Sequence, residues 1–422
     1  MAPRTRGAGD DAHTLAGRRI AVVNWRDLDH SLAGGAEIYA DQFARALVEG
    51  GAEVCFVTSR EPGQRRRERR DGMTVRRAGG RLGFYPASLL WLARHRRRWD
   101  AVIDPAGGLP VFSPLVLRRG TPALLVVHHV HQDQFGAHFP APVAAFGRWL
   151  ERVAMRRVYR RQPVVAVSTS TVREMRRRLG WSGAIGVLEN GADLPEPGSV
   201  DAGAKDPDRI VVLGRLVAHK RVDLVLGALH DLRNEPGLAG RDLRLDVIGR
   251  GPERERLEEL AQRLGVADVV TFHGFVSDEE KARLLDRASL HVCASDAEGW
   301  GQVVIDAAGR GVPTVARDVP GLRDSIRDGE TGWLVPEPVR RPTAGDADTL
   351  RRSLAQAMAS ALGSTASRSD RVHRAAACEA WATKFDWSQM RRQARRLTEG
   401  ILTGEAPAAP DHHHLPRARV AD

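Results

Sequence analysis

The feature that most constrains the fold is a repeated alternation of short apolar runs with longer helical patterns. A run at 19–23 is followed by a predicted helix from about 36 to 50 and by a second run at 53–58. Later runs of the same kind lie at 101–103, 123–127, 164–168, 209–214, 243–249, 269–273, 290–294 and 313–316. Because uninterrupted apolar strands need cover on both faces, this alternation predicts parallel sheets flanked by helices.

The length of the chain predicts two domains of this kind. A chain of 422 residues exceeds the size at which a single hydrophobic core keeps growing. Pro, Gly and Asp cluster near 190–207, just before the pattern restarts. We therefore expect an α/β fold of two doubly wound, Rossmann-like domains facing a central cleft. The expected parts are a disordered tail at 1–17, an N-terminal domain at 18–195, a C-terminal domain at 196–384, a last helix at 385–402 and a disordered tail at 403–422.

The formal net charge of +11 is carried almost entirely by arginine, since lysine occurs only at 205, 220, 281 and 384. Arginine clusters lie at 65–70, 94–98, 156–161 and 173–178. They fit a nucleic-acid surface, an anionic membrane surface, or solvated faces in an arginine-biased chain. No interleaved aromatic residues and no nucleic-acid-binding motif accompany the clusters. Nucleic acid is therefore not an expected partner, while an anionic membrane surface stays open.

The distribution of apolar residues and cysteines predicts a cytoplasmic location. No run approaches 18 uninterrupted apolar residues, and 1–17 lacks the apolar core of a signal peptide. The three cysteines, Cys55, Cys293 and Cys378, are far apart and without CxxC spacing, which suggests a reducing compartment and no metal cluster. A peripheral position at the inner face of the membrane remains an alternative.

Two carboxylates stand out near the end of the run at 290–294. Glu298 lies in a glycine-rich loop with Gly299 and Gly301, and Asp306 follows one or two turns into the next predicted helix. Carboxylates can accept hydrogen bonds from the hydroxyl groups of a sugar or a ribose. Glycine backbone groups and a helix N-terminus favour a close, negatively charged ligand. An ordinary solvated loop before a surface helix is the alternative.

Other candidate residues follow other predicted strands, where ligands bind in doubly wound sheets. Arg215 and Lys220 form a compact positive pair that suits a diphosphate, although a surface basic patch is the alternative. Gly35 begins a predicted helix whose N–H groups can contact a phosphate, or simply forms a tight turn before it. Gly249 ends a further strand.

Three histidines, His128, His129 and His131, follow the run at 123–127. Their spacing permits a zinc site, but no third ligand with convincing spacing lies nearby. A structural role and a hydrogen bond to a sugar or acceptor hydroxyl are the other interpretations. Alternate strand residues face opposite sides, so the sequence leaves open which histidine faces the cleft. We favour the hydroxyl contact, and His129 as the residue that makes it.

Several other classes of site are not expected. The segment at 27–29 has the Asp-x-Asp pattern that binds a divalent cation in some proteins. The same pattern occurs at 206–208 and 346–348, so all three segments are interpreted as loops. The sequence contains no GxSxG, Walker A, HExxH or GxGxxG motif. These absences argue against a serine hydrolase, a P-loop ATPase, a zincin protease and a typical dinucleotide dehydrogenase. No cofactor is expected, and no metal is expected because Arg215, Lys220 and helix N-termini can neutralise a diphosphate.

The ordered set of motifs closely resembles the family 4 retaining glycosyltransferases, which have the GT-B fold. The resemblance covers roughly 18–400. It rests on 34–37, 167–170, 189–193, 214–216 with Lys220, 249–252, 273–276, 298–306 and 329–335. It implies transfer of a hexosyl-type sugar from a UDP-, GDP- or dTDP-sugar to a hydroxyl of a glycan, a lipid-linked compound or a secondary metabolite. The anomeric configuration would be retained without a metal, and the last helix would return to the first domain.

The resemblance also implies roles for single residues. Glu298 would bind hydroxyls of the donor sugar, Arg215 and Lys220 would hold the diphosphate, and Gly35 would approach it from the N-terminal domain. Asp306 stands where the family usually has a glutamate that binds the ribose. Trp300 stands where the family commonly has phenylalanine, which would narrow the pocket.

Two other functions remain open at this point. One is a hydrolysing sugar-nucleotide epimerase, and the other is a sugar-nucleotide binding protein without catalysis.

Overall fold

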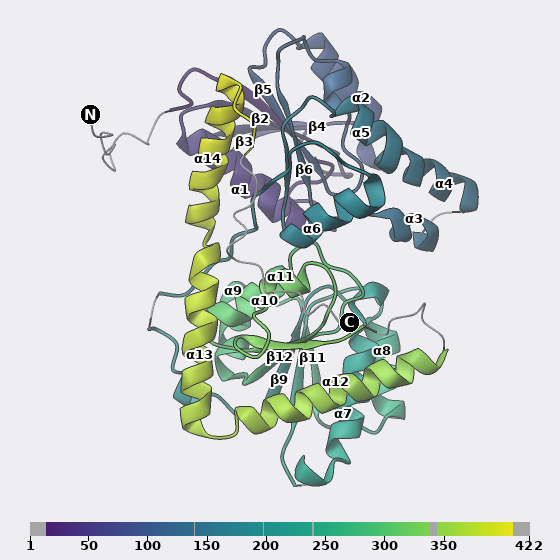
Figure 1. Cartoon of the computed structure of the whole chain (residues 1–422), viewed down its shortest axis with the longest axis vertical. Coiled ribbons are helices and arrows are strands. Elements are labelled where there is room, and N and C mark those ends of the chain that lie inside the picture. The colour runs from purple at the N-terminus through teal and green to yellow at the C-terminus, as the bar shows by residue number, and fades with distance from the viewer. Residues whose placement is uncertain (1–13, 139, 197, 239, 338–343, 408–422) are drawn as a thin grey trace. The chain divides into compact units, whose positions relative to one another are not determined.

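The computed structural model describes residues 14–138, 140–196, 198–238, 240–337 and 344–407. The chain divides into two compact units, which we call unit 1 (1–191 with 387–422) and unit 2 (192–386). Each unit has its own twisted sheet with helices packed on it (Figure 1). The predicted class, two doubly wound α/β domains, is confirmed.

The sheet of unit 1 has eight strands in the order β3-β4-β2-β1-β5-β6-β7-β8. All neighbouring pairs are parallel except β3 with β4. The strands are β1 (Arg19–Val23), β2 (Glu53–Thr58), β3 (Arg67–Arg70), β4 (Met73–Arg77), β5 (Ala101–Ala106), β6 (Ala123–Val127), β7 (Val164–Ala166) and β8 (Gly186–Val187). The order reverses between β1 and β5, so the switch point of this sheet lies there.

The helices of unit 1 include one from the C-terminal end of the chain. They are α1 (Gly35–Glu49), α2 (Gly80–Arg94), α3 (Gln132–His138), α4 (Ala141–Trp149), α5 (Met155–Val158), α6 (Thr169–Glu174) and α14 (Trp387–Thr403). In α14, Arg391 donates to Gln42 of α1 at 2.6 Å, and Arg395 pairs with Glu49 at 3.0 Å. The last helix therefore packs on the first helix of unit 1.

The sheet of unit 2 has six parallel strands in the order β11-β10-β9-β12-β13-β14. They are β9 (Arg209–Leu213), β10 (Arg244–Ile248), β11 (Val270–Gly274), β12 (Leu290–Cys293), β13 (Thr314–Arg317) and β14 (Gly332–Val335). Its helices are α7 (Val222–Arg233), α8 (Arg254–Arg263), α9 (Asp278–Arg287), α10 (Gln302–Gly309), α11 (Leu322–Ser325), α12 (Ala344–Ser364) and α13 (Arg368–Ala382). The switch point lies between β9 and β12.

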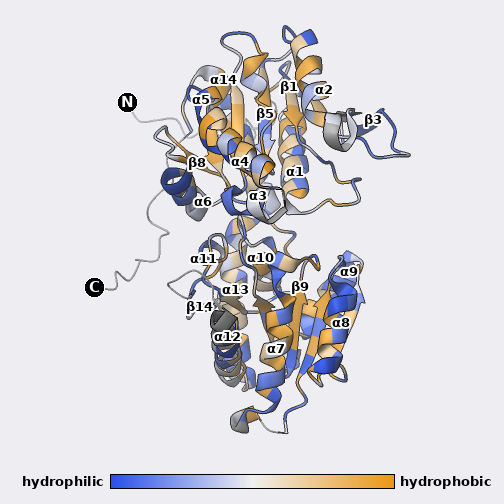
Figure 2. Ribbon diagram, turned by 90° about the vertical axis from the view of Figure 1, so that its right-hand side faces the viewer, coloured by the Kyte–Doolittle hydropathy of each residue, from blue (hydrophilic) through white to orange (hydrophobic). Residues whose placement is uncertain are grey.

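Burial explains why the apolar runs became strands. The side chains of β6 and β12 are all buried. In Figure 2 the central strands are orange, whereas α8 and α9 are largely blue. Four strands, β3, β4, β8 and β14, lay outside the sequence expectations. β3 is rich in arginine and only partly buried, and β14 continues the sheet at its edge with a mixed sequence.

The start of the described chain differs from the expected tail. The segment at 14–17 forms a turn rather than disorder, and Leu15 is 1% exposed. The N–H of Leu15 donates to the carbonyl of Gly50 at 2.9 Å, and Thr14 donates to Glu399 of α14. One apolar side chain in a polar segment is a weak signal in sequence, but here it fills a gap beside α1 and α14. Residues 1–13 and 408–422 of the expected tails lie outside the described residues.

Candidate active site

The centre of the candidate site is an ion pair at the switch point of unit 2. Lys220 lies in the loop after β9, and Glu298 lies in the loop after β12, the neighbouring strand. The ammonium group of Lys220 donates to Oε1 of Glu298, and the two side chains are only 17% and 16% exposed. The structure thus brings together two residues that the sequence selected 78 positions apart.

Both members of the pair are charged. Burial acts to lower the pKa of Lys220, but the charge of Glu298 outweighs it and the pKa is raised. Burial likewise acts to raise the pKa of Glu298, while Lys220 and a hydrogen bond from Ser295 lower it overall. A buried pair of opposite charges is held together strongly only while both partners are present. The loops after β9 and β12 are therefore tied to each other at this point.

Arg215 adds a second positive charge beside the pair. It is exposed in the loop after β9, and its charge acts on both Lys220 and His219. Burial lowers the pKa of His219, with a further contribution from Lys220. Arg215 and Lys220 together form a positive region at the carboxyl end of β9, as the sequence predicted.

Glycines allow the loops after β9 and β10 to lie against each other. Gly249 has φ +140°, and a Cβ there would lie 1.8 Å from the carbonyl oxygen of Gly214. A Cβ at Gly251 would lie 2.1 Å from the carbonyl oxygen of Leu216. The N–H of Leu216 donates to the carbonyl of Arg250 at 3.0 Å. Gly249 is therefore required by backbone packing beneath Arg215, whatever ligand it also contacts.

A second ion-pair network holds the loop that carries Glu298. Arg317, at the end of β13 and 6% exposed, donates to Asp296 and to the carbonyl of Ala294 at 3.1 Å. Its other side pairs with Glu337 at 2.8 Å, and Arg221 approaches Asp296 at 3.5 Å. Sequence reasoning missed this network. The only available signal was an arginine placed directly after a buried strand.

The loop then enters α10 through a glycine in the left-handed region, which favours glycine. Gly301, the N-cap of α10, has φ +88°, and a Cβ there would lie 2.6 Å from Oγ of Ser325. The neighbouring Trp300 is 4% exposed and packs edge-on against Phe385 with ring centroids 4.8 Å apart. The expectation that Trp300 narrows a sugar pocket stays a prediction. Its indole fills the interior of unit 2 and anchors the loop from behind.

Asp306 lies on α10 beside the lysine of a neighbouring helix. Gln302, one turn earlier, donates to its carboxylate at 3.3 Å. Burial raises the pKa of Asp306, and the charge of Lys281 on α9 acts in the opposite direction. Asp193 and Asp278 also act on this carboxylate. Asp306 thus belongs to a small charged group with Lys281. The helix that carries Asp306, α10, begins directly after the Glu298 loop.

In unit 1 the Gly34-Gly35 turn opens α1 at the carboxyl end of β1. Glu37 accepts a hydrogen bond from the N–H of Gly34 at 2.8 Å and pairs with Arg26 at 2.9 Å. Glu37 is therefore a structural residue of the turn. A Cβ at Gly35 would meet no atom within 4 Å, so the backbone of Gly35 is open to a ligand.

The three histidines occupy different environments. His128 is 6% exposed and packs edge-on against Tyr39, and burial lowers its pKa to about 4. His131 is 8% exposed, and its backbone N–H donates to Glu151 at 2.6 Å. His129 is the most exposed of the three, and its ring lies 3.7 Å from that of His131. His129 is thus the one best placed to meet a solute.

The acidic residues at 27–29 have a structural partner. Asp27, Asp29 and Glu68 are the group of carboxylates in the described chain that most resembles a metal site. The guanidinium of Arg77, itself 3% exposed, lies among them, at 2.8 Å from Asp27, 2.6 Å from Asp29 and 2.7 Å from Glu68. The acidic residues therefore neutralise a buried arginine.

Known families match each unit. The model for glycosyl transferases group 1 matches residues 200–357, and the model for Glycosyltransferase Family 4 matches residues 33–196. The chain is 29% identical over 287 residues to alpha-D-kanosaminyltransferase of Streptomyces kanamyceticus, covering 62% of this chain and 71% of that relative. Alignments to several other curated relatives cover less than half of their length.

Solved structures show the same fold. Sucrose-phosphate synthase from Thermosynechococcus elongatus superposes with a TM-score of 0.73 at 20% identity, over 92% of this chain and 100% of that chain. Anabaena HepE, solved in complex with UDP and glucose, superposes with a TM-score of 0.65 at 16% identity, over 91% of this chain and 100% of its own.

These findings define a glycosyltransferase with the GT-B fold. The chain belongs to the family 4 glycosyltransferases, as its motifs indicated. The comparisons support sugar transfer, and they do not favour the epimerase or the non-catalytic binding protein.

A buried histidine next to the ion pair provides a test of this geometry. His291 of β12 is 0% exposed, and its Nδ1 lies 3.0 Å from the hydroxyl of Thr314. Burial, with a smaller contribution from the charge of Lys220, lowers its pKa to about 3. The folded protein therefore keeps this histidine neutral, whereas the unfolded chain takes up a proton below pH of about 6.5.

We predict that His291→Asn removes part of the acid sensitivity of the fold. The folded pKa is lower than the unfolded pKa, so stability is lost as pH falls below the unfolded value. Between pH 7 and 5 the wild-type protein should lose about 2 kcal/mol more than the variant. Urea denaturation at both pH values measures the difference. Equal losses in the two proteins would show that His291 is protonated in the folded state or not enclosed.

Proposed function

We propose that the protein transfers a sugar from a nucleoside diphosphate sugar to a hydroxyl group, with retention of the anomeric configuration and without a metal ion. The Lys220–Glu298 pair at the switch point of unit 2 carries this proposal. It places a cation for the diphosphate and a carboxylate for the sugar hydroxyls side by side. The UDP and glucose bound to HepE support a nucleotide sugar as the donor.

The pair has a direct mechanistic meaning. Without donor, Glu298 neutralises Lys220. A bound diphosphate brings its own negative charge to Lys220 and Arg215, which leaves oxygens of Glu298 free to accept hydrogen bonds from the donor sugar. Negative charge grows on the leaving diphosphate as the bond to the sugar breaks, and these two cations and the N-terminus of α10 stabilise it. Such stabilisation reduces the need for a divalent cation.

Retention requires the acceptor to attack from the side that the diphosphate leaves. In the proposed route the bond from the anomeric carbon to the phosphate oxygen breaks, and the acceptor oxygen forms the new bond on the same face. The released phosphate oxygen takes the acceptor proton, so no carboxylate nucleophile is needed. His129 is the proposed contact to the acceptor, and Gly35 offers its open backbone to the diphosphate.

The donor is identified first by binding. In a thermal-shift panel of UDP-, GDP- and dTDP-sugars containing EDTA, we expect one nucleotide sugar to raise the melting temperature, because binding to the folded state stabilises it. Arg215→Gln should lose most of the shift. Arg263→Gln, a change of the same kind on exposed α8, should keep it. A shift that appears only after Mg²⁺ is added would contradict metal-independent binding.

Turnover tests the role of Glu298. Glu298→Gln should lower kcat by at least about a hundredfold, a loss of roughly 2.7 kcal/mol of transition-state stabilisation, because the amide holds the sugar hydroxyls less strongly. Glu235→Gln, an exposed glutamate of the same unit, is the matched control and should leave kcat unchanged. Near-normal turnover of Glu298→Gln would remove this residue from the mechanism.

We also propose that an anionic membrane surface is a partner of unit 1. No helix among the described residues is long and apolar enough to cross a membrane. On α4, however, Val143, Phe146 and Trp149 are each about half exposed, and the last two rings stack at 5.9 Å. Exposed Arg152 and Arg157 follow in the chain. Exposed aromatic residues beside cations are typical of surfaces that lie at a lipid interface.

Vesicle binding tests this surface. The double variant Phe146→Ser/Trp149→Ser should weaken co-sedimentation with phosphatidylglycerol vesicles at low salt by at least about tenfold, because it removes the apolar side chains that insert. Leu115→Ser, another exposed apolar residue of unit 1, is the control. Binding that is unchanged by the double variant would contradict the proposal.

A further inference from the structure

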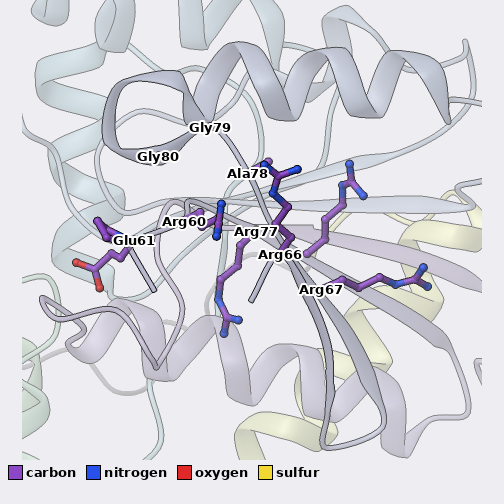
Figure 3. Close-up of a pocket in the computed structure, with 10 residues that line it drawn as sticks. Arg60, Glu61, Arg66, Arg67, Arg77, Ala78, Gly79 and Gly80 are labelled. Carbon is purple, nitrogen blue, oxygen red and sulfur yellow. The ribbon is translucent and has the colours of Figure 1, made fainter. Parts of the chain in front are cut away.

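A second positively charged site lies in unit 1. A pocket of about 770 Å³ opens at the carboxyl ends of β2 and β4 (Figure 3). Its lining residues are Arg60, Glu61, Pro62, Arg66, Arg67, Arg76, Arg77, Ala78, Gly79 and Gly80. Five of these ten residues are arginine and one is acidic. Asp27, Asp29 and Glu68 balance the charge of Arg77, so the other four arginines carry the positive excess.

The arginines are arranged so that they repel one another. Arg67 of β3 and Arg76 of β4 are direct cross-strand partners in the only antiparallel pair of the described sheet. Like charges at such opposite positions are destabilising. Arg76 lies over the ring of Trp91 at 5.4 Å, and its Nε–H is buried without an acceptor within the described chain. This edge of the sheet therefore carries unbalanced positive charge.

The nearby carboxylates are already engaged elsewhere. Glu61 accepts hydrogen bonds from the N–H and the hydroxyl of Ser31 at 2.8 and 2.6 Å, and these bonds lower its pKa. Glu68 accepts from Arg77 at 2.7 Å. For Arg66 and Arg67, by contrast, the described residues supply no hydrogen bond or ion pair to the guanidinium group. Both residues are exposed, so an external anion can reach these two guanidinium groups.

The backbone adds further donors to the pocket. Gly79, with φ +80°, is the N-cap of α2, a helix of 15 residues. A glycine has no side chain that could cap the helix, so the first N–H groups of α2 stay available to a ligand. Figure 3 shows Gly79 and Gly80 where the chain enters α2, above the arginines. A helix N-terminus next to free guanidinium groups favours an oxyanion with several acceptor oxygens.

We propose that this pocket binds the phosphate group of the acceptor. The proposal rests on the transferase function proposed above. In that function the donor binds at the Lys220–Glu298 pair of unit 2, so a pocket in unit 1 is assigned to the acceptor. Glu61 lies 3.6 Å from the ring of His30 and accepts hydrogen bonds from Ser31, and these contacts connect the pocket to the loop that precedes Gly34. A phosphate held here would anchor an acceptor whose hydroxyl reaches the open backbone near Gly35.

Calorimetric titration with glycerol 1-phosphate at about 0.15 M salt, where surface charges are screened, tests the pocket directly. Arg66→Gln/Arg67→Gln should weaken binding at least about tenfold, because each guanidinium supplies charge-assisted hydrogen bonds. The matched control is Arg96→Gln/Arg97→Gln, which removes two exposed arginines beyond the other end of α2. The control should bind the phosphate within about twofold of the wild-type protein.

Two further measurements separate the possible outcomes. Thermal stabilisation by the nucleotide sugar should be the same in both double variants. This result would show that both variants fold and that donor binding does not depend on the substituted arginines. Equal weakening in the two double variants, or none in either, would overturn the phosphate pocket even where donor binding is intact.

A second experiment decides whether the phosphate belongs to a soluble compound or to a lipid headgroup. Phosphatidylcholine vesicles that carry phosphatidic acid are compared with glycerol 1-phosphate as ligands for the same three proteins. Weakening of both by Arg66→Gln/Arg67→Gln alone would assign a phosphate that is reached equally in solution and in a headgroup. Weakening of vesicle binding alone, again only in this variant, would assign a lipid phosphate.

Discussion

The ion pair between Lys220 and Glu298 is the interaction on which the rest of unit 2 depends. It joins the loops after two neighbouring strands at the point where the strand order reverses. Parallel strands end at the same edge of a sheet, so this is where a side chain from each half of the sheet can meet. A buried pair also restricts both loops, because separating the charges leaves each one without compensation. The site is therefore held in shape before a ligand arrives.

The surrounding residues hold in place the two loops that carry this pair. Arg317 holds the loop from β13, Trp300 fills the space behind it, and Gly301 allows the sharp entry into α10. On the other side, Gly249 permits the close contact of two backbones under Arg215. Rigid supports of this kind reduce the reorganisation that is needed as charge develops during a reaction. In the proposed function these supports stay fixed, and only the anion beside Lys220 changes, from the Glu298 carboxylate to the diphosphate of the donor.

Sequence reasoning located most of the strands and selected both Lys220 and Glu298, although not their pairing, because strands and strand-end residues depend on local signals. Apolar runs identify buried strands, and a polar residue directly after a strand lies at the ligand-binding edge. Long-range partners leave no such signal. The contact of Arg317 with Asp296 spans 21 positions, and the burial of Trp300 depends on Phe385, which is distant in sequence. The strand β3 was missed because its sequence is charged, and its pairing with β4 rather than its composition makes it a strand.

The high arginine content has different physical meanings at different positions. Arg77 and Arg317 are buried and enclosed by carboxylates, so their charges are balanced inside the fold. Arg66 and Arg67 lie on an edge where the neighbouring strand adds a further arginine and the nearby acids are occupied. The net charge of the chain does not distinguish these two groups of arginines. It is a sum over the whole chain and does not show which arginines have a carboxylate beside them. What distinguishes a binding surface from a solvated face is positive charge that the fold concentrates and leaves without a partner, and the pocket at β4 meets that condition.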